Sequence, residues 1–194
     1  MPLRDSIAEL GQRLEEHGTQ TSDSPSFLLY VYPPRDEWTV RQDLNDLRLW
    51  LEARNLPCVS ISLAELMWEA LESQGWYESL VAAEQEFPGD AATLDDVIRS
   101  VAEILRQTPT LADRVVERLS EAPEGCVVFL YRAGALYPAF RTSALLEDLQ
   151  GRLSRPVVLL YPGRQVGSHG LSFMDQCEPA YGYRATIITR GEHE

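Results

Sequence analysis

The sequence of residues 27–32 is Phe27-Leu-Leu-Tyr-Val-Tyr32, an unbroken apolar run that is followed at once by Pro33-Pro34. A strand with one solvated face alternates apolar and polar residues, whereas a strand covered on both faces is apolar throughout. The run has the length of a strand, and the prolines end it because they cannot donate a ladder hydrogen bond. It therefore predicts a central strand of a sheet that is covered by helices on both faces.

Four further segments have strand character, and amphipathic segments separate most of them. These strands are expected at residues 58–62, 125–131, 156–161 and 184–189. Between the first two strands of the chain lies an apolar stripe at helical spacing, formed by Val40, Leu44, Leu47 and Leu51. Strands that alternate with helices imply a mainly parallel sheet. We predict an α/β fold with a mainly parallel sheet of about five strands and helices on both faces, Rossmann-like or ATPase-like without a Walker A loop.

Polar pairs at N-cap spacing mark the expected starts of three helices. The pairs are Ser62 with Glu65, Thr93 with Asp96, and Thr110 with Asp113. The last connection, residues 163–183, lacks helical periodicity. We therefore expect it to be irregular, and the final strand to pair antiparallel at a sheet edge.

A chain of 194 residues is long enough for one ordinary domain with a single core. Residues 1–19 have the pattern of a short amphipathic helix, and the polar stretch that continues to residue 25 has the composition of a linker. We predict an N-terminal helix and linker at residues 1–25 and a single α/β domain at residues 26–194.

Charge and composition exclude several classes of function. The net charge is −13, and nucleic-acid backbones are bound through basic side chains, so direct DNA binding is not expected. Every basic side chain is arginine, which excludes a Walker A lysine and a Schiff-base lysine. No apolar segment is long enough to span a bilayer, so we expect a soluble cytoplasmic protein without membrane contact. The three cysteines are widely spaced, and neither a metal site nor a disulfide is expected.

Three of the predicted strands end in a tyrosine that is followed closely by an arginine. These arginines are Arg35, Arg132 and Arg164. In parallel sheets the ligand crevice lies beyond the carboxyl ends of the strands, so the three side chains could share one rim and hold an anion or an acidic protein surface. The alternative is that they are unrelated surface arginines beside ordinary turns.

The loop after the fourth predicted strand is glycine-rich, with Gly163, Gly167 and Gly170. This spacing matches neither the Walker A nor the dinucleotide-binding pattern. Ser168, His169 and Asp175 lack the spacing of a nucleophile elbow, and adjacent side chains rarely align for proton transfer. We interpret His169 as a polar loop residue or an interface contact. The sequence predicts no catalytic residue, no cofactor and no metal ligand.

The four tryptophans lie in or near the two helices that flank the second strand. They are Trp38, Trp50, Trp68 and Trp76. We favour core packing over a partner-binding face, although exposed aromatic side chains would mark an interface.

Several segments in combination resemble the BrxB family, small proteins encoded in bacterial BREX phage-resistance systems. The segments are Tyr30–Trp38, Val127–Thr142, Pro156–Phe173 and Tyr181–Ala185. The similarity extends from about residue 27 onward, and no motif within it is catalytic.

The resemblance implies a component of a system that restricts phage and methylates host DNA, in which a phosphatase-like protein (PglZ), an ATPase (BrxC) and a methyltransferase are companions. We expect a non-catalytic adaptor that docks other BREX proteins, first PglZ and second BrxC. The candidate interaction or anion rim comprises Arg35, Arg132, Tyr137, Arg141, Tyr161, Gly163, Arg164 and His169. The alternative is a nucleotide- or phosphate-binding sensor or enzyme that uses the arginines at the strand ends.

Overall fold

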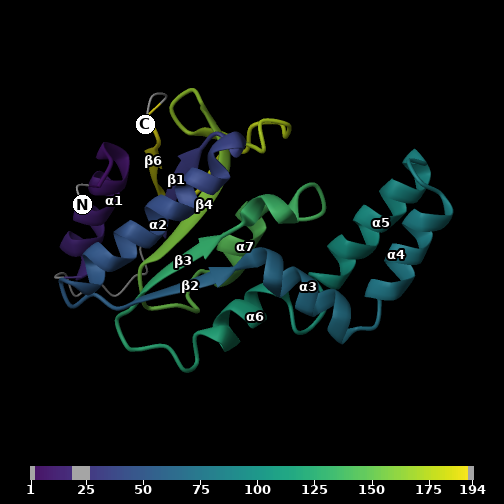
Figure 1. The fold of residues 1–194 in the computed structure, drawn as a ribbon, viewed down its shortest axis with the longest axis horizontal. Coiled ribbons are helices and arrows are strands. Elements are labelled where there is room, and N and C mark those ends of the chain that lie inside the picture. Colours follow the sequence, from purple (N-terminus) through teal and green to yellow (C-terminus); the bar gives the residue numbers. More distant parts are fainter. Residues whose placement is uncertain (1–2, 19–26, 192–194) are drawn as a thin grey trace.

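The sheet of this protein is mainly parallel in the computed structural model, which describes residues 3–18 and 27–191. Within these residues five parallel strands follow the order β2-β3-β4-β1-β6 (Figure 1). Their bounds are β1 (Phe27–Tyr32), β2 (Cys58–Ser62), β3 (Val127–Tyr131), β4 (Val157–Val166) and β6 (Thr186–Thr189). All six residues of β1 are buried, as the unbroken apolar run requires. The predicted α/β fold with a mainly parallel sheet is confirmed.

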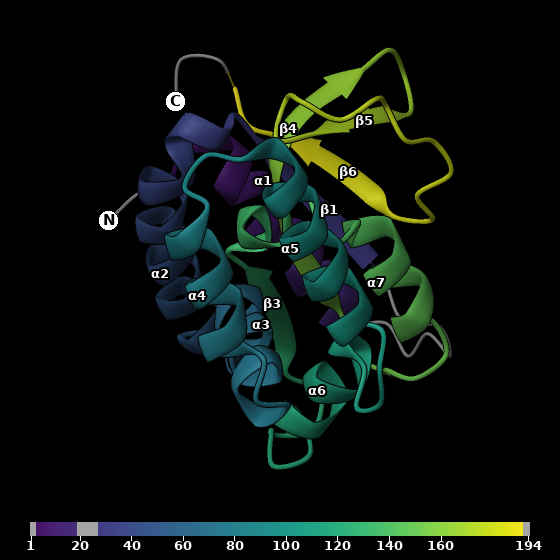
Figure 2. The ribbon, with the colours of Figure 1, turned by 90° about the vertical axis from the view of Figure 1, so that its right-hand side faces the viewer.

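The end of the chain differs from the prediction in two ways. β4 continues to Val166 and pairs antiparallel with β5 (Gly170–Phe173), so the expected strand end at residue 161 is wrong. Figure 2 shows this hairpin projecting beyond the sheet. The last strand, β6, is parallel to β1 and not antiparallel, with Leu28 opposite Thr186. The hairpin and residues 174–185 carry the chain back to the end of the sheet where β1 begins.

Helices cover both faces of the sheet, as Figures 1 and 2 show. One face carries α1 (Asp5–Gly18) and α2 (Glu37–Glu52), and the other carries α3 (Leu63–Ser73), α6 (Leu111–Arg118) and α7 (Thr142–Leu149). The 3₁₀ turns η1 (Pro34–Asp36) and η2 (Ala133–Leu136) follow β1 and β3. Each face has its own buried apolar cluster, because the side chains of a buried strand point alternately to opposite faces.

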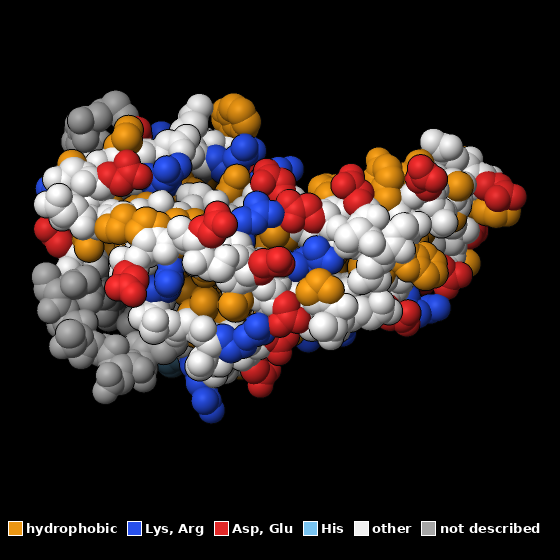
Figure 3. All heavy atoms as spheres, turned by 90° about the horizontal axis from the view of Figure 1, so that it is seen from below, with side chains coloured by type: hydrophobic (Ala, Val, Ile, Leu, Met, Phe, Trp, Pro, Cys, Tyr) orange, Lys and Arg blue, Asp and Glu red, His pale blue; other side chains and the backbone are white. Residues whose placement is uncertain are grey.

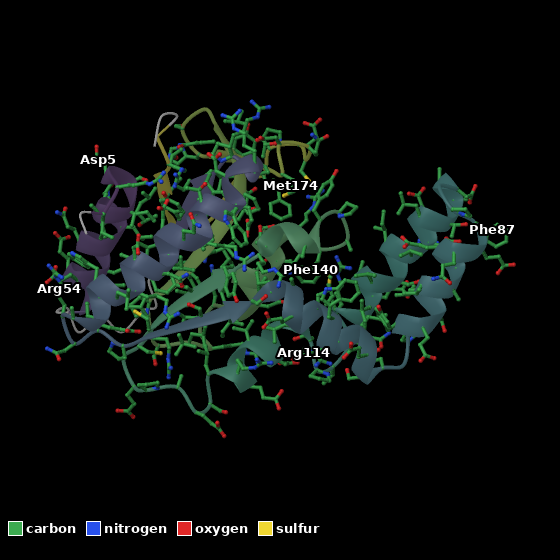
Figure 4. All side chains as sticks on the ribbon, in the orientation of Figure 1. Asp5, Arg54, Phe87, Arg114, Phe140 and Met174 are labelled. Atoms are coloured by element: carbon green, nitrogen blue, oxygen red, sulfur yellow. The ribbon has the colours of Figure 1, made fainter. Side chains whose placement is uncertain are left out.

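Two helices extend away from the sheet as an arm (Figure 1). They are α4 (Tyr77–Glu86) and α5 (Ala91–Ile104). No residue of α4 is buried, and Ile104 is the one buried residue of α5. Phe87, at the tip of the arm in Figure 4, is 53% exposed. The arm therefore contributes little to the core.

Side-chain caps begin three of the helices. The Ser62 hydroxyl accepts a hydrogen bond from the Glu65 N–H at 3.3 Å, and Thr110 with Asp113 forms the full reciprocal box, as predicted. The predicted cap of α5 is wrong. The Asp90 carboxylate begins this helix by accepting 2.8 Å hydrogen bonds from the N–H and the hydroxyl of Thr93, so the cap lies three residues before the threonine that we expected.

A buried ion pair ties the last strand to α2. Arg190, 3% exposed, donates to the Asp43 carboxylate at 2.6 Å, and its backbone N–H donates to the Val31 carbonyl. Arg4, just before α1, pairs with the same carboxylate at 3.2 Å. The apolar side chains of α1 are buried in the same face of the core. The predicted boundary between residues 25 and 26 lies outside the described residues.

Candidate functional site

Two of the three rim arginines, Arg35 and Arg132, follow the carboxyl ends of β1 and β3, whereas Arg164 lies within β4 because this strand continues to Val166. Each of them pairs with an acidic neighbour: Arg35 with Asp36 at 3.8 Å, Arg132 with Glu65 at 3.7 Å, and Arg164 with Asp175 at 3.6 Å. Arg35 is the most exposed, with 81% of its side chain open to solvent. The three charges are thus partly neutralised at the surface, where such pairs contribute little to stability.

The glycine-rich loop is an ordered β-hairpin. Gly163 lies opposite Phe173 in the β4–β5 ladder and has a φ of +155°. A Cβ atom at this position would lie 2.1 Å from the Ser172 carbonyl oxygen, so only glycine allows this approach. Gly170 is similarly crowded, because a Cβ there would lie 2.7 Å from the Val166 carbonyl oxygen. Close backbone packing accounts for these two glycines.

The polar residues of the hairpin do not assemble as a triad. The His169 Nδ1 lies 2.8 Å from the Ser168 hydroxyl, and both side chains are exposed. Asp175 pairs with Arg164. Among the cysteines, Cys58 has a pKa raised to about 11 by burial, which disfavours the reactive thiolate at neutral pH.

Four of the predicted site residues gather around Phe173. The rings of Tyr161 and Tyr137 lie 5.3 Å and 6.3 Å from its ring, centroid to centroid. Gly163 is its ladder partner, and Arg141 lines a shallow pocket with Tyr161 and Phe173. Tyr161 is fully buried, and this burial raises the pKa of its hydroxyl, which therefore stays protonated. The cluster anchors the hairpin onto the end of the sheet.

An apolar groove lies between the arm and the loop after β3. We call it the arm groove; its walls include Trp68, Tyr77, Leu80, Val97, Tyr137 and Pro138. Its volume is about 200 Å³. The rings of Trp68 and Tyr77 meet edge to face at 5.7 Å, and both remain more than two-fifths exposed. Tyr137 is the predicted site residue that reaches this groove.

A second groove lies beside α2. It is on the face of the sheet opposite to the face that α3 covers. We call it the α2 groove; its walls include Trp38, Arg41, Asn45, Arg48, Ser60 and Tyr131. Its volume is about 220 Å³. The Arg41 guanidinium lies 5.3 Å from the centre of the Trp38 ring and 6.0 Å from that of Tyr131. Neither Arg41 nor Arg48 was predicted from the sequence as a site residue.

The expectation that the tryptophans pack in the core is wrong for most of them. Trp38, Trp68 and Trp76 are 67%, 45% and 46% exposed, and Trp50 packs only partly buried against the core. Three of the four therefore lie at the surface, and two of these three line the grooves. Exposed aromatic side chains of this kind are typical of binding surfaces.

A family model described as "BREX protein BrxB" matches residues 59–188, more than half of the chain. The chain belongs to the BrxB family. Membership implies a component of a BREX phage-defence system, with other proteins of that system as partners. The matched residues contain the whole arm, β3 to β5, and all of β2 except Cys58. No curated protein and no solved structure matched the chain.

Two further features, a cluster of metal ligands and a membrane-spanning helix, are absent from the described residues. Among them, no group of three or more His, Cys, Asp or Glu side chains is placed to hold a metal ion. No helix in the described part of the chain is long and apolar enough to cross a bilayer.

Proposed function

We propose that this protein is a non-catalytic adaptor of a BREX system that docks another BREX protein through the arm groove. The observation that carries the proposal is the exposure of an aromatic, apolar groove on the arm. Family membership supplies the context of a multiprotein system. In this role the protein supports phage restriction and host DNA methylation, and its companions perform the chemistry.

The groove has the composition of a protein-docking site. Trp68, Tyr77 and Tyr137 project aromatic rings from three different elements, and half-buried aliphatic side chains form the floor between them. Aromatic side chains at the centre of an apolar patch contribute most of the binding energy in many interfaces. A small-molecule site would instead need several convergent polar groups, whereas Glu84 is the one charged residue that lines this groove in the described structure.

The charges around the groove favour a basic partner segment. Residues 72–100 contain seven acidic side chains and one arginine, Arg99, which is paired with Asp96 at 2.9 Å. Figure 3 shows acidic and hydrophobic side chains together on the arm. An apolar segment flanked by lysine or arginine would bury its apolar side chains in the groove and pair with the acidic border. We assign this segment to the PglZ-like companion first and to the BrxC-like companion second.

The rim at the strand ends is the less favoured candidate for binding. Each of its three arginines already has an acidic partner within 4 Å, so an incoming phosphate would compete with a carboxylate in every case. For this reason we place partner docking at the arm groove.

Co-purification of the full chain with the PglZ-like protein from the same system tests the proposal. The wild-type chain is expected to form a complex, and Trp68→Glu is expected to weaken it about thirtyfold or more, because loss of an aromatic anchor costs roughly 2 kcal/mol. Trp38→Glu is the matched control, since this tryptophan is also exposed but lies in the other groove. Circular dichroism checks that both variants are folded.

The proposal would be overturned by either of two results. One is that the folded wild-type chain binds neither the PglZ-like nor the BrxC-like protein at micromolar concentration. The other is that Trp68→Glu binds as tightly as the Trp38→Glu control.

A further inference from the structure

The α2 groove exists because of the strand order. The chain leaves β1 through α2 and must cross β4 and β3 before it enters β2 at the edge of the sheet. α2 does not fully cover this edge, and Ser60 of β2 and Tyr131 of β3 remain half-buried beside it. The result is a groove with α2 as one wall and the edge of the sheet as its floor.

Two arginines from one side of α2 face this groove. Arg41 and Arg48 are seven residues apart, which places them on the same side of a helix two turns apart. Arg41 is held by the rings of Trp38 and Tyr131, and no carboxylate of the described residues lies within ion-pair distance of it. Arg48 uses one terminal nitrogen to pair with Glu52 at 3.5 Å. The residues that line the groove include no acidic side chain, although the chain as a whole has a net charge of −13.

Two buried polar atoms at the groove lack partners in the described structure. They are the Nε of Arg48 and the hydroxyl oxygen of Ser60. Each of these two atoms exposes less than 1 Å² to solvent, so it lies behind the wall of the groove and not on its surface. The groups that the wall offers to a ligand are therefore the guanidinium groups of Arg41 and Arg48.

We propose that the α2 groove binds a nucleoside monophosphate. The two guanidinium groups match the charge of a phosphate monoester, whose terminal oxygens accept hydrogen bonds from guanidinium N–H groups. Trp38, 67% exposed at the groove, offers a ring on which a base stacks. A small nucleotide is preferred over a nucleic-acid strand because the negative charge of the rest of the surface repels a polyanion.

Calorimetric titration of the full-length chain with AMP, GMP, CMP and UMP tests this site. At least one of them is expected to bind, whereas the matching nucleoside, which lacks the phosphate, and inorganic phosphate, which lacks the base, are expected to bind at least about tenfold more weakly. Arg41→Gln is expected to weaken the nucleotide by about tenfold or more. Arg48→Gln and Ser60→Ala provide independent variants in case one of them fails to fold.

Arg99→Gln is the control, because this residue lies on the arm and lines neither groove. This variant is expected to bind the nucleotide like the wild type. The inference fails if no monophosphate binds the folded wild-type chain at millimolar concentration, if inorganic phosphate binds as tightly as the nucleotide, or if all three groove variants bind normally. These results leave the docking proposal untouched, since it depends on the arm groove.

Discussion

The α2 groove and the arm groove have similar volumes, but the helices α2 and α4 that form their walls differ greatly in how firmly they are packed against the core. α2 has five buried residues and is tied to the last strand by the Asp43–Arg190 ion pair, whereas α4 has no buried residue at all. Fixed positions suit a ligand that must meet several donors at once, because each hydrogen bond tolerates little displacement. A loosely supported apolar surface suits a protein partner, whose side chains can repack against it. The difference indicates that one protein keeps a rigid polar site and an adaptable apolar site apart.

The largest expected effect comes from removing Asp43, the closer of the two carboxylates that pair with Arg190; the other is Asp36, at 3.8 Å. Asp43→Ala is expected to lower the free energy of unfolding by about 3 kcal/mol, since it leaves a buried guanidinium without its closest carboxylate. Urea denaturation measures the loss. Asp46→Ala, on the same helix and half-buried, is the control and should change stability by less than about 0.5 kcal/mol. Equal effects of the two substitutions would contradict the special role of the ion pair.

Amide hydrogen exchange compares the two regions directly. Backbone amides of α4 are expected to exchange about a hundredfold faster than those of α2 after correction for intrinsic rates, because few buried contacts oppose local opening of the arm. Mass spectrometry of peptides from each helix gives the measurement. Similar protection in both helices would remove the contrast between a rigid and an adaptable groove. Slower exchange in α4 on addition of the docking partner would sharpen it.

The smallest expected effect concerns the cap of α5. Hydrogen bonds from the backbone N–H and hydroxyl of Thr93 lower the pKa of the Asp90 carboxyl. A carboxyl whose pKa is lower in the folded chain stabilises above its unfolded pKa, and this stabilisation is lost as the pH falls through the folded value. NMR should therefore show the first turn of α5 fraying in acid. Asp90→Asn keeps a capping oxygen without the titration, so a pH dependence that survives this substitution would contradict the assignment.

The fold was largely predictable because each central strand is marked by local composition. β1 and β3 are covered on both faces, and their apolar runs predicted them directly. The β4–β5 hairpin was missed because its residues are glycine-rich and polar. Local composition does not show that Gly163 and Phe173 pair with each other across the hairpin. The direction of β6 was also missed, since the residues of a strand do not show by which path the preceding chain returns to the sheet.

The grooves were less predictable because their walls come from separate elements. Arg41 and Arg48 could have been found from their spacing of seven on one helix, but Ser60 and Tyr131 reach the same groove from strands far along the chain. Tyr137 was selected on the basis of the family resemblance, yet its neighbours on the arm were not. The tryptophans were misassigned because hydrophobicity alone does not distinguish a core side chain from an exposed anchor.

The two outer strands of the sheet affect how the protein behaves in a crowded assembly. β2 has five residues and β6 has four, so each sheet border offers only a short row of backbone groups. Long exposed borders invite strands of other chains to add on and start aggregation. Short ones give little template for such addition. The protein can therefore accumulate beside many companions without its edge strands pairing with strands of other chains. Its association with partners is then left to the side chains of its helices.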